Sequence, residues 1–210
     1  RKEKQRLANA TKKLKKKYDD MNEITWYEDK SSGGYTSKFY AYIGKKENRA
    51  PWLRMYIRYY ADDWLFIESY QIKVDGKSYT IKEKEYGEIK TDNGSGSIWE
   101  TLDRTVDAET YEIIKAIANG KNVKIRHNGK DYYKDRTITS KEKLALRNVI
   151  DAFEALGGEI VQVSFQEEPD PDPDIDYGKK GAPLPPAIKY VLISANHEFS
   201  GIKHVEWCDG

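Results

Sequence analysis

The chain has 210 residues, of which 34% are charged and 12% are aromatic, and its 36 basic residues nearly balance its 35 acidic residues. The aromatic content argues against a disordered chain, because each buried ring removes a large apolar area from water, and the length suits one domain or one domain with a small appendage. The single cysteine, Cys208, excludes an intramolecular disulfide and a cysteine-based zinc site, and no apolar run is long enough to span a bilayer.

The first segment, residues 1–22, predicts a basic amphipathic helix. Apolar side chains recur every three or four positions over residues 5–21, with lysines between them. A cationic helix can bind nucleic acid or lie on an anionic membrane surface, so either is a possible partner of residues 1–17. The alternative is a solvated stem whose leucines pack on the folded domain. The lysines of this basic arm form one candidate site: Lys12, Lys13, Lys15, Lys16 and Lys17.

Residues 23–166 predict the main domain, built on an antiparallel β-meander. Apolar and polar side chains alternate in short runs that turn signals separate. The Asp75-Gly76 pair predicts a type I′ hairpin turn, because both residues tolerate a positive φ. The expected strands before the first helix of this domain are 24–28, 38–45, 52–60, 64–74, 78–84 and 98–102.

Two helices are expected to pack on the meander, which makes the fold class α+β. The first spans residues 107–119, with Asp107 as its N-cap and Gly120 as its C-cap. The second spans residues 140–156 and opens with a capping box in the segment from Thr139 to Glu142.

The C-terminal third adds further strands and a linker. The Asn128-Gly129 pair predicts a second hairpin turn, and residues 159–166 predict another strand. Proline alternates with aspartate in residues 167–186, which predicts a stiff, solvated linker. Residues 187–210 predict a β-hairpin. Because an isolated hairpin is marginal in water, it must dock on the main domain, pair with a second copy of the chain or begin a second domain.

The strand at residues 52–60 has two chemically distinct faces. One face is apolar and predicts a core contact through Leu53, Met55, Ile57 and Tyr59. The opposite face predicts a protein-binding surface, because large flat rings lose little entropy on binding. Such rings and guanidinium groups also suit stacking on bases, and the plainest alternative is a coat on a solvated sheet. This second face carries Trp52, Arg54, Tyr56, Arg58 and Tyr60.

Several segments resemble a recurring module of small bacterial and prophage-encoded proteins, some of them predicted lipoproteins. The resemblance rests on ITWYEDK, FYAYIGKK, LRMYIRYYADDWLFIESYQIKVDGKSYTI, IWETLDR and KIRHNGKDYYKD, and it covers residues 18–158. It implies a bacterial or prophage origin, with the cell envelope or the cytoplasm as location, and it implies no catalytic residues. Residues 187–207 also resemble the opening hairpin of another small bacterial domain.

Other combinations of residues give weaker signals. Glu100 and Asp103 beside Trp99 could form a paired-carboxylate site of the glycosidase type. His197 and His204 could face each other across the last hairpin as a loose metal-ligand set. The sequence contains neither a nucleophile elbow nor a zinc-protease motif.

We therefore expect a non-enzymatic module that binds another macromolecule, most simply a protein, without a cofactor or a metal. One alternative is a nucleic-acid-binding accessory protein that uses the basic arm and the Arg/Tyr strand face. Another alternative is an enzyme of unrecognised chemistry.

Overall fold

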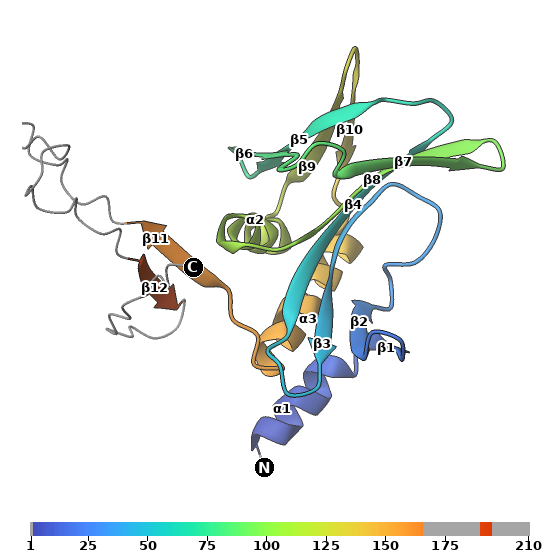
Figure 1. The fold of residues 1–210 in the computed structure, drawn as a ribbon. Coiled ribbons are helices and arrows are strands. Elements are labelled where there is room, and N and C mark those ends of the chain that lie inside the picture. The colour runs from blue at the N-terminus through green and yellow to red at the C-terminus, as the bar shows by residue number, and fades with distance from the viewer. Residues whose placement is uncertain (1, 166–189, 195–210) are drawn as a thin grey trace, which may run out of the picture. The chain divides into compact units, whose positions relative to one another are not determined.

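The computed structural model describes residues 2–165 and 190–194, and the chain divides into two units, residues 1–159 and 160–210 (Figure 1). Within its described residues the first unit contains three helices: α1 (Lys2–Thr11), α2 (Ala108–Asn119) and α3 (Ser140–Ala155). Its strands are β1 (Leu14–Asp19), β2 (Ile24–Asp29), β3 (Lys38–Lys46), β4 (Trp52–Ala61), β5 (Ile67–Val74), β6 (Lys77–Lys82), β7 (Ile89–Gly94), β8 (Ser97–Thr105), β9 (Val123–Gly129) and β10 (Tyr133–Thr137).

Among the described residues, all the strand pairs are antiparallel. Those of the first unit form two sheets. The six-stranded sheet has the order β1-β2-β3-β4-β8-β7, and the four-stranded sheet has the order β10-β9-β5-β6 (Figure 1). The expected β-rich α+β class with an N-terminal helix is therefore confirmed. The chain leaves the first sheet after β4 and enters the second at β5, through a crossover segment at residues 62–66. The strand expected at 64–74 begins only at Ile67, because the residues before it form this crossover.

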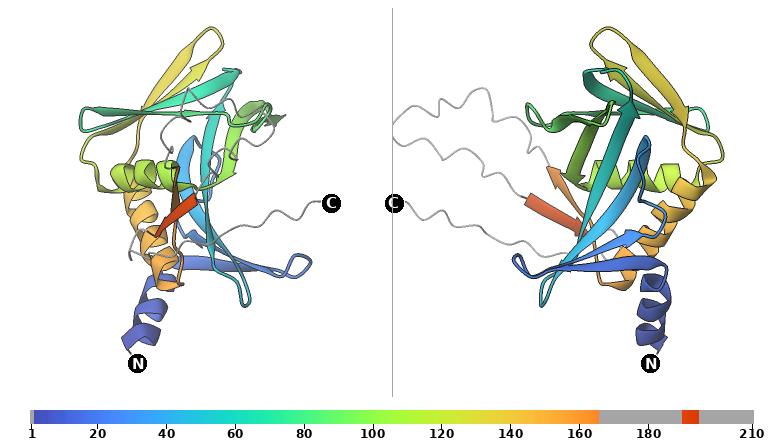
Figure 2. Two further views of the ribbon diagram at one scale, coloured as in Figure 1. Left: turned by 60° about the vertical axis from the view of Figure 1, so that its left-hand side comes forward. Right: turned by 90° about the vertical axis from the view of Figure 1, so that its right-hand side faces the viewer.

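The core lies between the sheets and the helices. The inward face of β4 is confirmed, since Leu53, Met55 and Ile57 are completely buried. Helix α3 packs against β2 and β3 and also contacts α1 and α2 (Figure 2). A buried hydrogen bond of 2.9 Å from the Asn148 amide to the Asp29 carboxylate links α3 to the end of β2.

Both helices of the main domain begin as the sequence predicts. The Asp107 carboxylate accepts a hydrogen bond from the backbone nitrogen of Thr110 at 2.9 Å and caps α2. Thr139 and Glu142 form the complete capping box at the start of α3. The capping bonds join residues within three positions of one another, which explains why these helix starts can be predicted from the sequence.

The N-terminal helix is shorter than expected, so the prediction of a helix over residues 5–21 is wrong in extent. Helix α1 ends at Thr11, and the lysine-rich residues after it form β1, paired along its length with β2. Two tertiary effects outweigh helix propensity here: the free edge of β2 supplies a ladder of backbone partners, and Leu14 becomes buried. The Asp19 carboxylate holds the following turn by accepting hydrogen bonds from the backbone and amide nitrogens of Asn22.

The hairpin turns differ in how well they were predicted. The Asp75-Gly76 turn is confirmed, with φ values of 47° and 100° between the paired Val74 and Lys77. The prediction of a turn at Asn128-Gly129 is wrong, because both residues belong to β9 and the chain reverses at residues 130–132. A further hairpin was missed: β7, where the sequence predicted no strand, pairs with β8 around a turn at residues 95–96.

The second unit contains one described strand pair. Strand β11 (Val161–Phe165), which falls within the strand expected at 159–166, pairs antiparallel with β12 (Tyr190–Ser194). The linker at 167–186 lies outside the described residues, as do the return strand of the C-terminal hairpin, His197, His204 and Cys208.

Candidate functional site

The candidate site is the outer face of the six-stranded sheet, defined as the side of β4 that carries Trp52, Arg54, Tyr56, Arg58 and Tyr60. All five of these side chains are partly exposed. Direct pairing with the neighbouring strands extends this face sideways, since paired residues of adjacent strands share a side. The pairing adds Trp26 and Glu28 from β2, Tyr40 and Tyr42 from β3, and Trp99 and Asp103 from β8.

An aromatic cluster occupies the middle of the outer face. Tyr40 and Tyr56 stack with their ring centroids 4.8 Å apart, and Trp26 lies 5.5 Å from Tyr42. Trp26 also meets the edge of Trp52 at 5.7 Å. Rings in such contact hold one another in place, so the cluster is a preorganised surface.

Gly44 explains how the two tryptophans meet. It lies between Trp26 and Trp52 in the register of β2, β3 and β4. A Cβ atom at this position would fall 2.3 Å from the Trp52 indole. The missing side chain thus leaves the space that the Trp52 indole occupies beside Gly44.

Arg54 is bound within its own face. Its Nε donates to the Tyr42 hydroxyl at 2.8 Å and to the Asp103 carboxylate at 2.9 Å, and an Nη nitrogen lies 2.9 Å from the same carboxylate. The Tyr42 hydroxyl in turn donates to Asp103 at 2.7 Å. This triad bridges β3, β4 and β8, and it uses much of the hydrogen-bonding capacity of Arg54.

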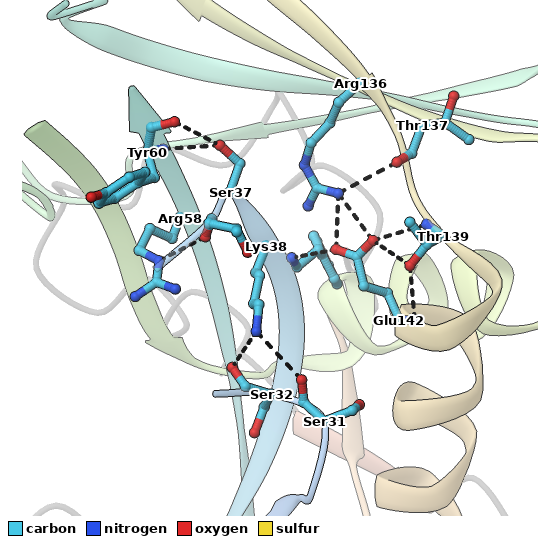
Figure 3. Close-up of polar contacts among 12 residues, drawn as sticks. Ser31, Ser32, Ser37, Lys38, Arg58, Tyr60, Arg136, Thr137, Thr139 and Glu142 are labelled. Atoms are coloured by element: carbon cyan, nitrogen blue, oxygen red, sulfur yellow. Dashed lines mark hydrogen bonds and ion pairs between the residues drawn. The ribbon is translucent and has the colours of Figure 1, made fainter. Parts of the chain in front are cut away.

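Arg58 has a comparable structural role. Its Nε donates to the backbone oxygen of Thr36 at 3.0 Å (Figure 3). A second nitrogen donates to the backbone oxygen of Gly34. Arg58 therefore anchors the loop between β2 and β3 to β4.

The lysine run lies at the edge of the same face. In β1, Lys17 pairs with Trp26 and Lys15 pairs with Glu28, to which it forms an ion pair of 3.0 Å. Lys16 points to the other side, with its ammonium 5.8 Å from the ring centre of Tyr27. Lys12 and Lys13 precede β1 and are exposed. The basic arm and the Arg/Tyr strand face were predicted as separate sites. The structure brings Lys15 and Lys17 of the basic arm onto the same surface as the Arg/Tyr strand face.

An open depression of about 460 Å³ lies between the aromatic cluster and the lysines of β1. Burial raises the pKa of Tyr40, with the charge of Glu28 adding to the effect. Burial also raises the pKa of Tyr42, and its hydrogen bond to Asp103 raises it further. Both phenols therefore stay protonated at neutral pH and offer flat rings for binding, while the Tyr42 hydroxyl hydrogen is directed at Asp103. The lining residues of this depression are Lys15, Lys16, Lys17, Trp26, Glu28, Tyr40, Tyr42, Tyr56 and Asp103.

Sequence reasoning missed the members of this site on other strands. Trp26, Tyr40 and Tyr42 lie within the predicted strands, and their alternation shows that they share one side of each strand. The order of the strands is what brings them beside β4, and periodicity carries no information on strand order.

The structure separates the paired carboxylates that were considered for glycoside hydrolysis. Glu100 is completely buried on the inner side of β8, whereas Asp103 lies on the outer face. Residues three apart on a strand point to opposite sides, so the two carboxylates cannot flank one substrate bond.

His127 is the one histidine within the described residues, and it is buried on the inner side of β9. Its ring lies 5.6 Å from Tyr59 of β4 and 5.5 Å from Tyr70 of β5. Burial, reinforced by the nearby charge of Arg136, lowers the pKa of His127 to about 4. Among the described residues, no group of three or more His, Cys, Asp or Glu side chains is arranged to hold a metal ion.

We expect His127 to make the fold sensitive to acid. Its pKa falls from the ordinary value of 6.5 to about 4 on folding, so protons bind the unfolded state more readily. The contribution of His127 to stability is therefore fully present above pH 6.5. As the pH falls toward 4, the free energy of unfolding decreases by about 3 kcal/mol. Urea titrations across this pH range test the expectation, with H127Q as the control that lacks the titrating ring. A His127 ring that titrates near its ordinary pKa in an NMR experiment would contradict it.

No helix among the described residues is long and apolar enough to cross a membrane. Comparison of the chain with family models, with curated proteins and with solved structures finds no significant match.

Proposed function

We propose that this chain is a non-enzymatic protein-binding module and that the outer face of the six-stranded sheet is its contact surface. The observation that carries the proposal is the preorganised aromatic cluster beside an open depression with lysines at its edge. Tryptophan, tyrosine and arginine dominate the energetics of protein interfaces, and rings already held in place lose little entropy on binding.

The charges on the outer face favour a partner with acidic side chains. Glu28 and Asp103 are each paired to a basic residue, Lys15 and Arg54. Lys17 adds a further positive charge beside Trp26. A peptide that combines apolar and acidic side chains would place the former in the aromatic cluster and the latter along β1.

The alternative of nucleic-acid binding has less support from this geometry. Phosphate recognition depends on basic groups that are free to contact the backbone. Arg54 is engaged by Tyr42 and Asp103, and Arg58 by the loop it anchors. The lysines of β1 remain available to phosphates, so the experiment below includes an oligonucleotide. The expected bacterial or prophage origin and the location in the envelope or the cytoplasm stay predictions.

Selection of a displayed peptide library against the intact chain tests the proposal. We expect the enriched peptides to combine aromatic or aliphatic residues with aspartate or glutamate. In W26A, the dissociation constant of an enriched peptide should rise about tenfold or more, because an aromatic anchor of the contact is lost. In Y86A it should not change, because Tyr86 is fully exposed and lies outside the outer face.

Salt dependence separates the two kinds of partner. Peptide binding through the rings should weaken only modestly between low and physiological salt, whereas binding to phosphates falls steeply. Equal affinity of the peptides for W26A and the unmodified chain would contradict the proposal. It would also fail if single-stranded oligothymidylate bound tightly with a steep salt dependence while no peptide was enriched.

A further inference from the structure

A second pocket, of about 490 Å³, lies between the β2–β3 loop, the start of β3, the end of β10 and the first turn of α3 (Figure 3). Three basic side chains line it, Lys38, Arg136 and Lys141, and Glu142 is the single acidic residue among its lining residues. Hydroxyl groups of Ser31, Ser32, Thr36, Ser37, Thr137 and Thr139 also belong to the lining residues. The pocket is distinct from the depression on the outer face, although Tyr40 borders both.

The Glu142 carboxylate is already engaged by its own chain. It accepts hydrogen bonds from the backbone nitrogens of Phe39 at 3.0 Å and Thr139 at 2.8 Å, and it forms an ion pair of 2.8 Å with Arg136 (Figure 3). One basic residue is therefore balanced, and the charges of Lys38 and Lys141 are left without a matching acid in the pocket lining.

Arg136 retains unused donors. One terminal nitrogen contacts Glu142, whereas the Nε and the other terminal nitrogen are enclosed without a hydrogen-bond partner among the described residues. Figure 3 shows only one of its nitrogens directed at Glu142. Both of these nitrogens are shielded from solvent, so a ligand in the pocket cannot reach them, and Arg136 acts on the site through its charge alone.

Lys38 also carries uncompensated charge. Its ammonium donates to the backbone oxygens of Ser32 at 3.1 Å and Ser31 at 3.4 Å, which are neutral groups, so one of its three donors remains. Burial lowers the pKa of Lys38 and the charges of Arg58 and Lys141 lower it further, while the charges of Glu142 and Glu28 offset this only in part. A negative charge in the pocket would relieve this repulsion.

The wall of the pocket is held in place without a ligand. Arg58 ties the backbone oxygens of Gly34 and Thr36 to β4. Asp29 accepts hydrogen bonds from the backbone nitrogen and the hydroxyl of Ser31, at 2.8 and 2.6 Å, and from Asn148 of α3. A preformed pocket of this kind binds a small ligand with little cost for ordering the loop.

We propose that this pocket binds a small organic phosphate monoester. A phosphate monoester carries between one and two negative charges at neutral pH, whereas a carboxylate carries one. The positive charges of Lys38 and Lys141 therefore match the phosphate monoester better. The remaining donor of Lys38 and the exposed ammonium of Lys141 match its oxygens. The volume exceeds that of phosphate alone, and the half-buried ring of Tyr40 and the serine and threonine hydroxyls are suited to the organic part.

Titration calorimetry of the intact chain with phenyl phosphate, benzoate and inorganic phosphate tests the proposal. We expect phenyl phosphate to bind with a dissociation constant below roughly 1 mM, and benzoate to bind about tenfold more weakly. NMR shifts caused by phenyl phosphate should concentrate in residues 31–40 and 136–142. K141A should weaken binding about tenfold, because an exposed charge at the pocket is removed.

K124A is the matched control, since Lys124 is equally exposed and lies outside the pocket lining. The proposal is overturned if phenyl phosphate fails to bind at roughly 10 mM, if K141A and K124A bind it equally, or if the shifts lie elsewhere. Equal binding of benzoate would overturn the assignment to phosphate. A double variant, K38M with K141A, should lose binding altogether. If that variant does not fold, the comparison of K141A with K124A still decides.

Discussion

Replacing Glu100 with glutamine is expected to lower the free energy of unfolding by about 3 kcal/mol, because a buried carboxylate loses part of its hydrogen bonding. Glu100 is completely buried in β8 and accepts hydrogen bonds from three successive backbone nitrogens of the crossover, those of Leu65, Phe66 and Ile67, at 2.7, 3.0 and 2.6 Å. Glutamine keeps the shape, but its amide nitrogen faces backbone donors and leaves at least one of them unpaired.

Urea denaturation followed by circular dichroism measures this loss. The matched control is E68Q, which makes the same chemical change at an exposed position of β5 and should alter stability by less than about 0.5 kcal/mol. Similar stabilities of E100Q and E68Q would show that the crossover does not depend on the buried carboxylate.

Replacing Gly129 with alanine is the second large effect, and we expect it to cost about 3 kcal/mol in the free energy of unfolding. A Cβ atom at Gly129 would lie 2.0 Å from the backbone oxygen of Leu65 and 2.7 Å from its Cγ atom. A backbone oxygen cannot swing aside as the end of a flexible side chain can, so either β9 or the crossover must move.

Gly33 provides the control for this substitution. Nothing lies within 4 Å of a Cβ atom built there, so G33A should be nearly neutral or slightly stabilising, by less than about 1 kcal/mol. Thermal unfolding of both variants under one set of conditions compares them. A G129A protein as stable as G33A would contradict the close approach of β9 to the crossover.

Glu100 and Gly129 act on the same segment from different sheets. Glu100 belongs to the six-stranded sheet and Gly129 to the four-stranded sheet, and the backbone nitrogen of Lys130 also donates to the oxygen of Phe66 at 3.2 Å. Phe66 has a φ of 54°, which is uncommon for a residue with a large side chain. The crossover therefore holds an unfavourable backbone conformation because both sheets bind it.

The sequence was most informative where the relevant interactions are local. The capping box of α3, the N-cap Asp107 and the Asp75-Gly76 turn depend on hydrogen bonds or φ preferences within a few residues. The alternation in residues 52–60 also identified the buried face of β4 correctly, because one strand imposes its period of two on both of its faces.

Predictions failed where a distant partner decides the outcome. Lys15, Lys16 and Lys17 belong to a strand because β2 offers an unpaired edge, and a helical sequence pattern contains no information about that edge. Asn128 and Gly129 have the composition of a turn, but the glycine is needed where β9 passes the backbone of Leu65. Glu100 looked like an ordinary charged residue in a chain that is one-third charged, although it is buried and holds the crossover.

The α+β class, most of the strands and the two helices of the main domain could be predicted from the residues, because periodicity, capping and turn chemistry act over short distances. Which strands are neighbours became known only from the folded chain. That order gathers Trp26, Tyr42, Tyr56 and the lysines of β1 on one face, binds Arg54 to Asp103, and brings Lys38 and Arg136 to one pocket. Strand order depends on contacts between segments far apart in the chain, and the pattern within a single strand does not encode them.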